Sequence, residues 1–227
     1  PVQIALFLLF YFLSITMLAL FGFHKYFLLR VYNKYKKQPL PLPPLPEEWP
    51  LLCIQLPVFN ERYVVKRLLK SVTALEYPKE KLHIQVLDDS TDNTRTLISR
   101  MTNLLKKQGY YIDHVRRKNR RGFKAGALAY GLERTSAEYI AIFDADFFPR
   151  PDFLHKTIPH LLQEGIGMVQ ARWGHANRNY SLLTRIQATL LDAHFEIEHL
   201  ARNRSGRFFN FNGTAGVWRK KAIQDAG

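Results

Sequence analysis

The chain opens with a long apolar run. No charged side chain occurs between Pro1 and Phe23, where Leu, Phe, Ile and Ala are dense. About 20 such residues are enough to cross a bilayer. A cleaved signal peptide would carry its basic residues before the apolar run and a small-residue cleavage site after it. Here the basic residues follow the run, so we predict a retained membrane helix over residues 1–29. Since the chain starts with Pro1, we also expect a piece of a longer protein.

A basic and then proline-rich segment, residues 30–50, separates this helix from the rest. The basic residues that follow the apolar run are Lys25, Arg30, Lys34, Lys36 and Lys37. The positive-inside rule places them in the cytoplasm, where they can contact lipid headgroups. Residues 38–50 read QPLPLPPLPEEWP, a composition typical of an extended spacer. A ligand for a proline-recognition domain is the alternative interpretation.

From residue 51 to residue 227 short apolar runs alternate with helical periods. Strands are predicted at 51–56, 83–87, 110–115, 139–143 and 165–171, with a short strand end at 208–212. One helix is predicted to begin at residue 65. A second is predicted to end at about residue 106, with Ser90 or Thr91 as its N-terminal cap, and further helices are predicted over 124–134, 151–163 and 182–200. This alternation predicts an α/β domain with a mostly parallel sheet and flanking helices.

Acidic residues stand where the predicted strands end. Asp144 and Asp146 follow the strand at 139–143, and Asp88 and Asp89 follow the strand at 83–87. In open α/β sheets ligands bind at this edge. Two carboxylates held close together repel each other unless a cation or a proton lies between them. Mg²⁺ and Mn²⁺ take such oxygen ligands, often with substrate phosphates. A solvated turn, or helix capping by Asp88 and Asp89, is the alternative.

Other polar segments could bind a phosphate or a sugar. Lys124 and the backbone amides at the start of its helix suit a phosphate, although an ordinary basic helix start is the alternative. No Walker A spacing and no G-x-G-x-x-G after the first strand occur. Asn212, Gly213 and Thr214 lie among aromatic residues, a mixture that suits a sugar ring or a simple turn. Arg172 and Trp173 end the fifth strand and could meet a diphosphate or an acceptor sugar.

Composition narrows the classes of partner. The net charge is +14, from 33 Lys and Arg against 19 Asp and Glu. Such an excess suits nucleic acid, anionic lipid or phosphorylated substrates. The chain shows no RRM, KH or zinc-knuckle pattern, so we do not expect a nucleic-acid-binding module. The single Cys53 excludes an intrachain disulfide and a cysteine-built zinc site, and we expect it to be a buried small residue.

Six motifs in order resemble the family-2 glycosyltransferases, and within them the processive cellulose-synthase-like branch of mannan and glucomannan synthase type. The resemblance covers about residues 50–227. The motifs are PVFNE (57–61), VLDDSTD (86–92), GFKAGAL (122–128), FDADF (143–147), VQARW (169–173) and FNGTAGVWR (211–219). Each motif alone is weakly specific, whereas the ordered set is strongly so.

The resemblance implies a GT-A fold that binds a nucleotide sugar and faces the cytoplasm. It implies that Asp144 and Asp146 hold Mg²⁺ or Mn²⁺ and the diphosphate, as the catalytic pair. The acceptor side would be formed by Asn212, Gly213 and Thr214, and we also assign Arg172 and Trp173 to it. The implied donor-binding residues are Pro57, Glu61, Asp88, Asp89, Lys124 and Asp144.

The implied activity is inverting transfer of a hexose from UDP-glucose or GDP-mannose to a growing β-glycan, such as β-1,4-mannan or glucan. A non-processive transferase acting on a lipid acceptor, a dolichyl-phosphate or a ceramide, is the alternative. The family's catalytic base, in a Thr-Glu-Asp motif, and its Gln-x-x-Arg-Trp motif are expected beyond Gly227. The chain by itself is therefore expected to bind donor rather than turn it over, and its oligomeric state is not indicated.

Overall fold

The computed structural model describes residues 2–38 and 40–226. They form two compact units. The helical unit comprises the residues up to Leu40 together with Arg172–Asn210, and the sheet unit comprises Pro41–Ala171 together with the residues from Phe211 onward. The domain boundaries drawn from the sequence, 1–29, 30–50 and 51–227, stay a prediction.

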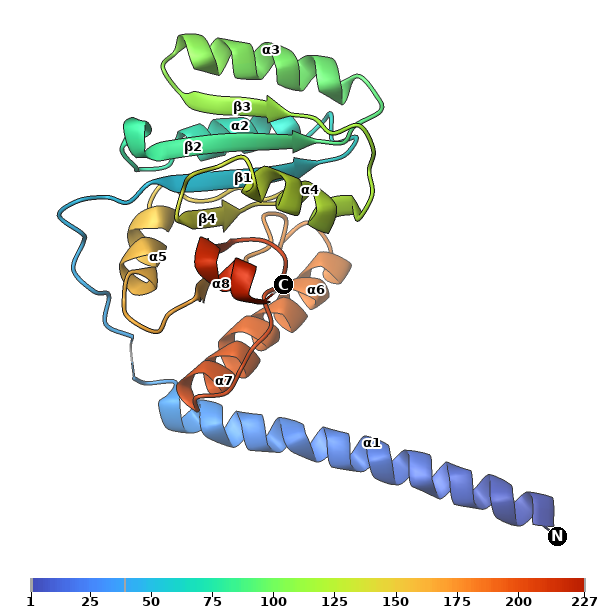
Figure 1. Ribbon diagram of the computed structural model, residues 1–227. Helices are drawn as coiled ribbons and strands as arrows, with labels where there is room; N and C mark the ends of the chain where they lie inside the picture. The colour runs from blue at the N-terminus through green and yellow to red at the C-terminus, as the bar shows by residue number, and fades with distance from the viewer. Residues whose placement is uncertain (1, 39, 227) are drawn as a thin grey trace. The chain divides into compact units, whose positions relative to one another are not determined.

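The sheet unit is built on a six-stranded sheet with the order β3-β2-β1-β4-β6-β5 (Figure 1). Strands β1 to β4 pair in parallel, whereas β6 runs antiparallel to both of its neighbours. The predicted α/β architecture with a mostly parallel sheet is confirmed. The strands are β1 (Leu52–Val58), β2 (Leu82–Asp88), β3 (Tyr111–Val115), β4 (Tyr139–Ile142), β5 (Met168–Gln170) and β6 (Gly216–Arg219).

The strand end predicted at 208–212 was wrong, because the last strand begins only at Gly216. Gly213 and Ala215 have positive φ angles of 83° and 54°, which the extended backbone of a strand does not allow. Gly216 then pairs with Ile142 on one side and Gln170 on the other. Because β6 is antiparallel, this register brings the residues just before it to the edge where β4 and β5 end.

Helices connect the strands of this unit. The predicted cap of α3 was wrong: the helix starts at Thr94, whose amide donates to Asp92 Oδ1 at 2.9 Å. Ser90 is buried and its hydroxyl instead accepts from the amide of Asn60 at 2.9 Å, so it serves a contact between two loops. The helices are α2 (Val65–Thr73), a 3-10 turn η1 (Lys79–Lys81), α3 (Thr94–Lys107), α4 (Phe123–Leu132), α5 (Phe153–Leu161) and α8 (Lys220–Ala226).

One face of the sheet packs on α4 and α8. Cys53 is fully buried there next to Ile140, with Leu128 and Leu132 of α4 and Ile223 of α8 against them. Cys53 is thus the buried small residue expected from the sequence. Burial raises the pKa of its thiol to about 12. Hydrophobic burial of this kind is the main favourable contribution to the stability of the unit.

A polar pair lies inside the same face. Gln55 of β1 donates to Gln85 Oε1 of β2 at 3.1 Å and to the Leu128 carbonyl at 3.3 Å. Gln85 in turn donates to the carbonyl of Arg134 at 3.2 Å. These bonds satisfy two buried amides. They depend on the missing side chain of Gly131, because a Cβ at that position would lie 2.6 Å from Gln55 Nε2.

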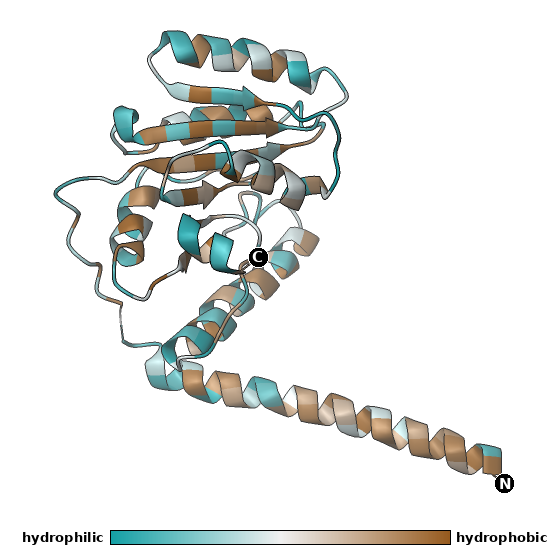
Figure 2. Cartoon of the chain, viewed as in Figure 1, coloured by the Kyte–Doolittle hydropathy of each residue, from teal (hydrophilic) through white to brown (hydrophobic). Residues whose placement is uncertain are grey.

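The helical unit contains α1 (Val2–Tyr35), α6 (Leu182–Asp192), a π-helical turn η2 (Ala193–His199) and α7 (Leu200–Arg204). Helix α1 has the length and the apolar composition to cross a membrane, and most of its ribbon has the hydrophobic colour in Figure 2. It continues past residue 29, the predicted end of the membrane helix. At its carboxyl end Lys25 bonds Glu198 at 3.0 Å and the Arg207 guanidinium lies 4.4 Å from the Phe27 ring.

Replacing Gly131 by Ala is expected to lower the free energy of unfolding by about 1–3 kcal/mol, the usual cost of overpacking. A Cβ there would lie 2.6 Å from Gln55 Nε2 and 2.8 Å from both Gln85 Oε1 and Leu87 Cδ2. Thermal unfolding of the detergent-purified chain measures the effect. Gly174→Ala is the matched control, since its added Cβ meets nothing within 4 Å. Equal unfolding temperatures for the two variants would contradict the prediction.

Candidate functional site

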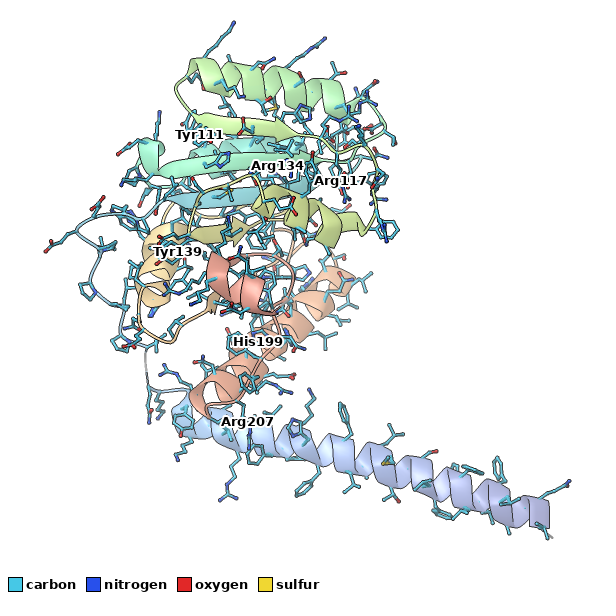
Figure 3. All side chains as sticks on the ribbon, viewed as in Figure 1. Tyr111, Arg117, Arg134, Tyr139, His199 and Arg207 are labelled. Atoms are coloured by element: carbon cyan, nitrogen blue, oxygen red, sulfur yellow. The ribbon has the colours of Figure 1, made fainter. Side chains whose placement is uncertain are left out.

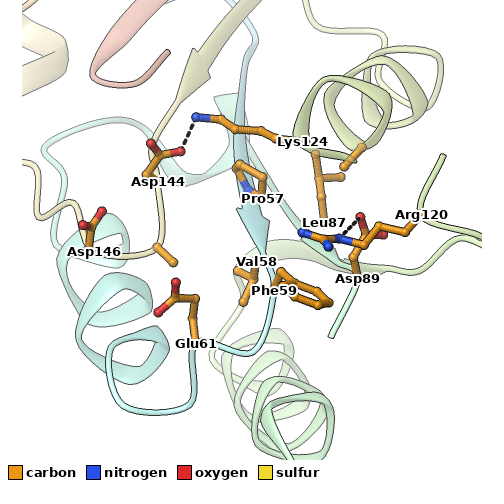
Figure 4. A pocket seen from close by; sticks show the side chains of 12 residues that line it. Pro57, Val58, Phe59, Glu61, Leu87, Asp89, Arg120, Lys124, Asp144 and Asp146 are labelled. Carbon is orange, nitrogen blue, oxygen red and sulfur yellow. Dashed lines mark hydrogen bonds and ion pairs between the residues drawn. The ribbon is translucent and has the colours of Figure 1, made fainter. Parts of the chain in front are cut away.

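A pocket of about 350 Å³ lies in the sheet unit, where β1, β2 and β4 end (Figure 4). This volume is in the range of small-molecule sites. The pocket confirms that the acidic strand ends of β2 and β4 share one edge of the sheet. It is lined by Pro57, Val58, Phe59, Glu61, Leu87, Asp89, Arg120, Lys124, Ala127, Asp144, Ala145 and Asp146.

Asp144 is held firmly at the end of β4. Its amide donates to Thr214 Oγ1 at 2.8 Å. Its carboxylate accepts a hydrogen bond from Lys124, whose ammonium also donates to the Gly213 carbonyl at 2.8 Å. Asp146 and Glu61 point into the same pocket, as Figure 4 shows, and among the described residues their side chains make no hydrogen bond or ion pair.

This donor set fits a divalent cation that arrives with a phosphate. Among the described residues there is no group of three or more His, Cys, Asp or Glu side chains placed to hold a metal ion. Asp144 and Asp146 still offer carboxylate oxygens to the pocket. Mg²⁺ in phosphate sites is commonly bound by one or two carboxylates, with substrate phosphates completing the shell. Two carboxylates therefore suffice for a metal that a phosphate helps to hold.

Asp88 does not line the pocket. Its side chain is fully buried, accepts from the amide of Ser90 at 2.8 Å and bonds His114 Nε2 at 2.7 Å. Burial raises the pKa of Asp88, but the hydrogen bonds from His114 and Ser90 outweigh it, so the pKa lies below its ordinary value. The geometry thus gives Asp88 a role in positioning β3 and the loop after β2, while its predicted nucleoside contact stays a prediction.

Asp89 lines the pocket and organises the basic loop, residues 116–124. Arg117, which is labelled in Figure 3, donates to both Asp89 oxygens, at 2.7 and 2.5 Å. These bonds raise the pKa of the Arg117 guanidinium. Arg117 also donates to the carbonyls of Arg121 and Phe123, each at 2.6 Å. One salt bridge therefore fixes the start of α4 relative to the end of β2.

Two further pocket residues were missed by the sequence analysis. The Arg120 guanidinium lies 3.4 Å from the centroid of the Phe59 ring, and its Nε lies 4.0 Å from Asp89 Oδ2. Together with Asp89 they line one end of the pocket with a flat ring, a flat guanidinium group and a carboxylate. The other end is lined by the carboxylates of Asp144 and Asp146. The signal available in the sequence was the cluster of arginines before Gly122, but its partners lie far away along the chain.

The turn 212–215 adjoins the carboxylate end of the pocket. Gln170, also missed by the sequence analysis, holds this turn: it donates to the Thr214 carbonyl at 3.0 Å and accepts from the Asn212 amide at 3.1 Å. Arg172 and Trp173 instead belong to the helical unit. There Arg172 bonds Asp192 at 2.8 Å and the Trp173 ring packs on Phe195, with centroids 5.4 Å apart. Acceptor binding by these residues stays a prediction.

The chain is similar in sequence to known proteins of one family. The sequence model described as Glycosyl transferase family 2 matches residues 53–225. The chain is 46% identical over 185 residues to "Probable glucomannan 4-beta-mannosyltransferase 7" of Oryza sativa subsp. japonica, a match that covers 79% of this chain and 32% of that protein. It is 44% identical over 186 residues to "Glucomannan 4-beta-mannosyltransferase 1" of Cyamopsis tetragonoloba, covering 80% and 35%. The chain thus spans about a third of the length of these curated relatives.

A solved structure has the same fold. It is a mannosyltransferase from Pyrobaculum calidifontis in complex with GDP-Man and Mn2+, with a TM-score of 0.74 and 22% identity. The match covers 94% of this chain and 57% of that one. At this level of identity the likeness shows the fold alone, and it confirms the predicted GT-A fold.

Replacing Asp88 by Asn is expected to lower the free energy of unfolding by about 2 kcal/mol, because a charge-assisted hydrogen bond to His114 is lost. The pKa of Asp88 is depressed in the folded state, so its contribution is complete above about pH 4 and is lost as the pH falls through the folded-state pKa. Thermal unfolding between pH 7 and pH 3 should show a shallower acid decline for the variant. An unchanged decline would contradict the role given to Asp88.

Proposed function

The chain belongs to glycosyl transferase family 2, and we propose that the whole protein transfers a hexose from a nucleotide sugar to a growing β-glycan. The observation that carries the proposal is the convergence of Asp89, Lys124, Asp144 and Asp146 on one pocket at the strand ends. A nucleoside diphosphate needs hydrogen-bonding groups for its base and ribose, and positive charge for its phosphates. The two ends of this pocket provide these features.

Each end of the pocket has its own role in donor binding. Phe59 and Arg120 offer flat faces to a base, and Asp89 offers carboxylate oxygens to the hydroxyl or N–H groups of the nucleoside. Asp144 and Asp146 would hold Mg²⁺ or Mn²⁺ beside the diphosphate. Such an ion supplies Lewis-acid stabilisation of the leaving diphosphate. Lys124 adds a further positive charge to the same end of the pocket.

We infer GDP-mannose as the donor and a β-1,4-linked glycan as the acceptor. The relatives at 46% and 44% identity are named glucomannan 4-beta-mannosyltransferases, and the structural neighbour was solved with GDP-Man and Mn2+. These names favour mannosyl transfer over glucosyl transfer. They also favour a polysaccharide acceptor over the lipid acceptors considered from the sequence.

Helix α1 is proposed to anchor the protein in a membrane with its basic carboxyl end in the cytoplasm. Its apolar part carries no charge before His24, and Lys34, Lys36 and Lys37 follow near the helix end. Retention of basic residues on the cytoplasmic side is the general rule for such helices. The sheet unit, which follows this flank along the chain, would then lie on the cytoplasmic side of the membrane.

Replacing Asp146 by Asn is expected to weaken binding of GDP in the presence of Mn²⁺ at least tenfold, because one of the two carboxylate ligands is lost. Isothermal titration of the detergent-purified chain measures it, and EDTA should weaken the wild type to a similar degree. Glu164→Gln, an exposed carboxylate outside the pocket, is the matched control. GDP affinity that is the same with and without EDTA would exclude the metal from donor binding.

The orientation of α1 can be tested with a single cysteine at position 36. The Lys36→Cys variant should react with a membrane-impermeant maleimide only after the cell membrane has been permeabilised. Position 36 is exposed, so it can react, and it lies in the flank proposed to be cytoplasmic. The unsubstituted chain is the control: its Cys53 is buried and its pKa is raised to about 12, so it should not react. Labelling of intact cells at position 36 would reverse the proposed orientation.

A further inference from the structure

Lys124 connects the donor carboxylate to the turn on the acceptor side. Its ammonium donates to Asp144 and to the Gly213 carbonyl, the latter at 2.8 Å. A tight backbone turn places Lys124 at the start of α4, because Gly122 and Phe123 have positive φ angles of 73° and 47°. Arg117 fixes that turn through the Phe123 carbonyl at 2.6 Å. The position of Lys124 is therefore set by its backbone.

The Lys124 ammonium is hydrogen-bonded to one oxygen of the Asp144 carboxylate, a group that a metal ion at this site would also need. Asp144 and Asp146 are two carboxylates without a third His, Cys, Asp or Glu among the described residues to complete a site. A monovalent cation on one of them reduces the negative charge available to a divalent ion, and the two cations repel each other. A diphosphate would remove this conflict, because its negative charge can accept both the ammonium and the divalent ion.

The same contacts hold the turn 212–215. Asp144 donates its amide to Thr214 Oγ1 at 2.8 Å, and Lys124 bonds the preceding carbonyl, that of Gly213. Thr214 is almost fully buried, whereas the side chains of Lys124 and Asp144 are 39% and 35% exposed. If the Lys124–Asp144 ion pair breaks, the buried turn can therefore be affected through the hydrogen bond between Lys124 and the Gly213 carbonyl. Lys124 has a flexible four-carbon stem and can exchange one anionic partner for another.

We propose that Lys124 is a built-in cation that holds the Asp144 carboxylate and the Gly213 carbonyl until a diphosphate and a divalent ion arrive together. Lys124 then exchanges these partners for the diphosphate, and the turn 212–215 loses the hydrogen bond that Lys124 gives to the Gly213 carbonyl. Metal binding thereby depends on the nucleotide, and loading of the donor is transmitted to the acceptor side. This inference rests on the proposed function, since it takes a nucleoside diphosphate as the ligand of the pocket.

The first test measures binding of Mn²⁺ alone to the detergent-purified chain by electron paramagnetic resonance of the free ion. Lys124→Met should bind Mn²⁺ about tenfold more tightly than the wild type, because the competing cation is gone. Lys124→Arg keeps the positive charge and should bind Mn²⁺ as weakly as the wild type. GDP should increase Mn²⁺ affinity at least tenfold in the wild type, and by a smaller factor in Lys124→Met.

The second test follows hydrogen exchange of the backbone amides in residues 211–216. Exchange should be faster in Lys124→Met without ligand than in the wild type, and Mn²⁺ with GDP should accelerate exchange in the wild type. Mn²⁺ affinity that is unchanged or lower in Lys124→Met, with Lys124→Arg folded and equal to wild type, would overturn the inference. So would exchange in this segment that neither variant nor ligand alters.

Failure of the proposed function gives a different result. If GDP binds neither the wild type nor any variant, with or without Mn²⁺, nucleotide binding by this pocket is excluded. In that case the expected ligand-dependent acceleration of exchange is absent too, and the exchange of partners at Lys124 is overturned with it. If GDP binds with Mn²⁺ but Lys124→Met leaves Mn²⁺ affinity unchanged, the proposed function stands and only the role of Lys124 is removed.

Discussion

Negative charge gathered where β2 and β4 end has to be balanced by positive charge, and much of the sheet unit is arranged to meet this requirement. Asp88 bonds His114, Asp89 bonds Arg117 and Asp144 bonds Lys124. All three partners come from the single stretch that runs from the end of β3, which holds His114, to the first turn of α4, which holds Lys124. An unpaired carboxylate at these buried or half-buried positions would be costly. The basic stretch is therefore first a structural counter-charge for the aspartates, which also explains part of the excess of Lys and Arg.

This pairing leaves one part of the edge uncompensated. Asp146 and Glu61 face the pocket without an ion pair among the described residues, while Asp144 shares its ammonium with a backbone carbonyl. The charge therefore differs between the two ends of the pocket. At one end Asp89 is paired with arginines, and at the other end carboxylates attract cations. Such a difference suits a ligand that carries a flat polar group at one end and a metal-bound phosphate at the other.

The antiparallel strand β6 brings the turn 212–215 to the same edge of the sheet. A sixth parallel strand would place its first residues at the opposite edge of the sheet. Because β6 is reversed, its register with β4 sets Gly216 beside Ile142 and puts the turn 212–215 against Asp144. The Gln170 side chain at the end of β5 supports this turn from the other side. The residues proposed to bind the donor therefore contact the turn proposed to bind the acceptor through direct hydrogen bonds.

The sequence by itself determined the strands β1, β2 and β4, the apolar helix α1 and the aspartates at the strand ends, because these follow from local hydrophobic runs and the cost of burying charge. It did not determine which aspartate is buried, where β6 begins, or that Arg117 and Gln170 support the site. The difference between Asp88 and Asp89 depends on partners about 26 and 28 residues away. The start of β6 depends on its pairing with β4 and β5. Only the tertiary structure brings such distant segments together, because hydrogen bonds and ion pairs between them leave no periodic pattern along the chain.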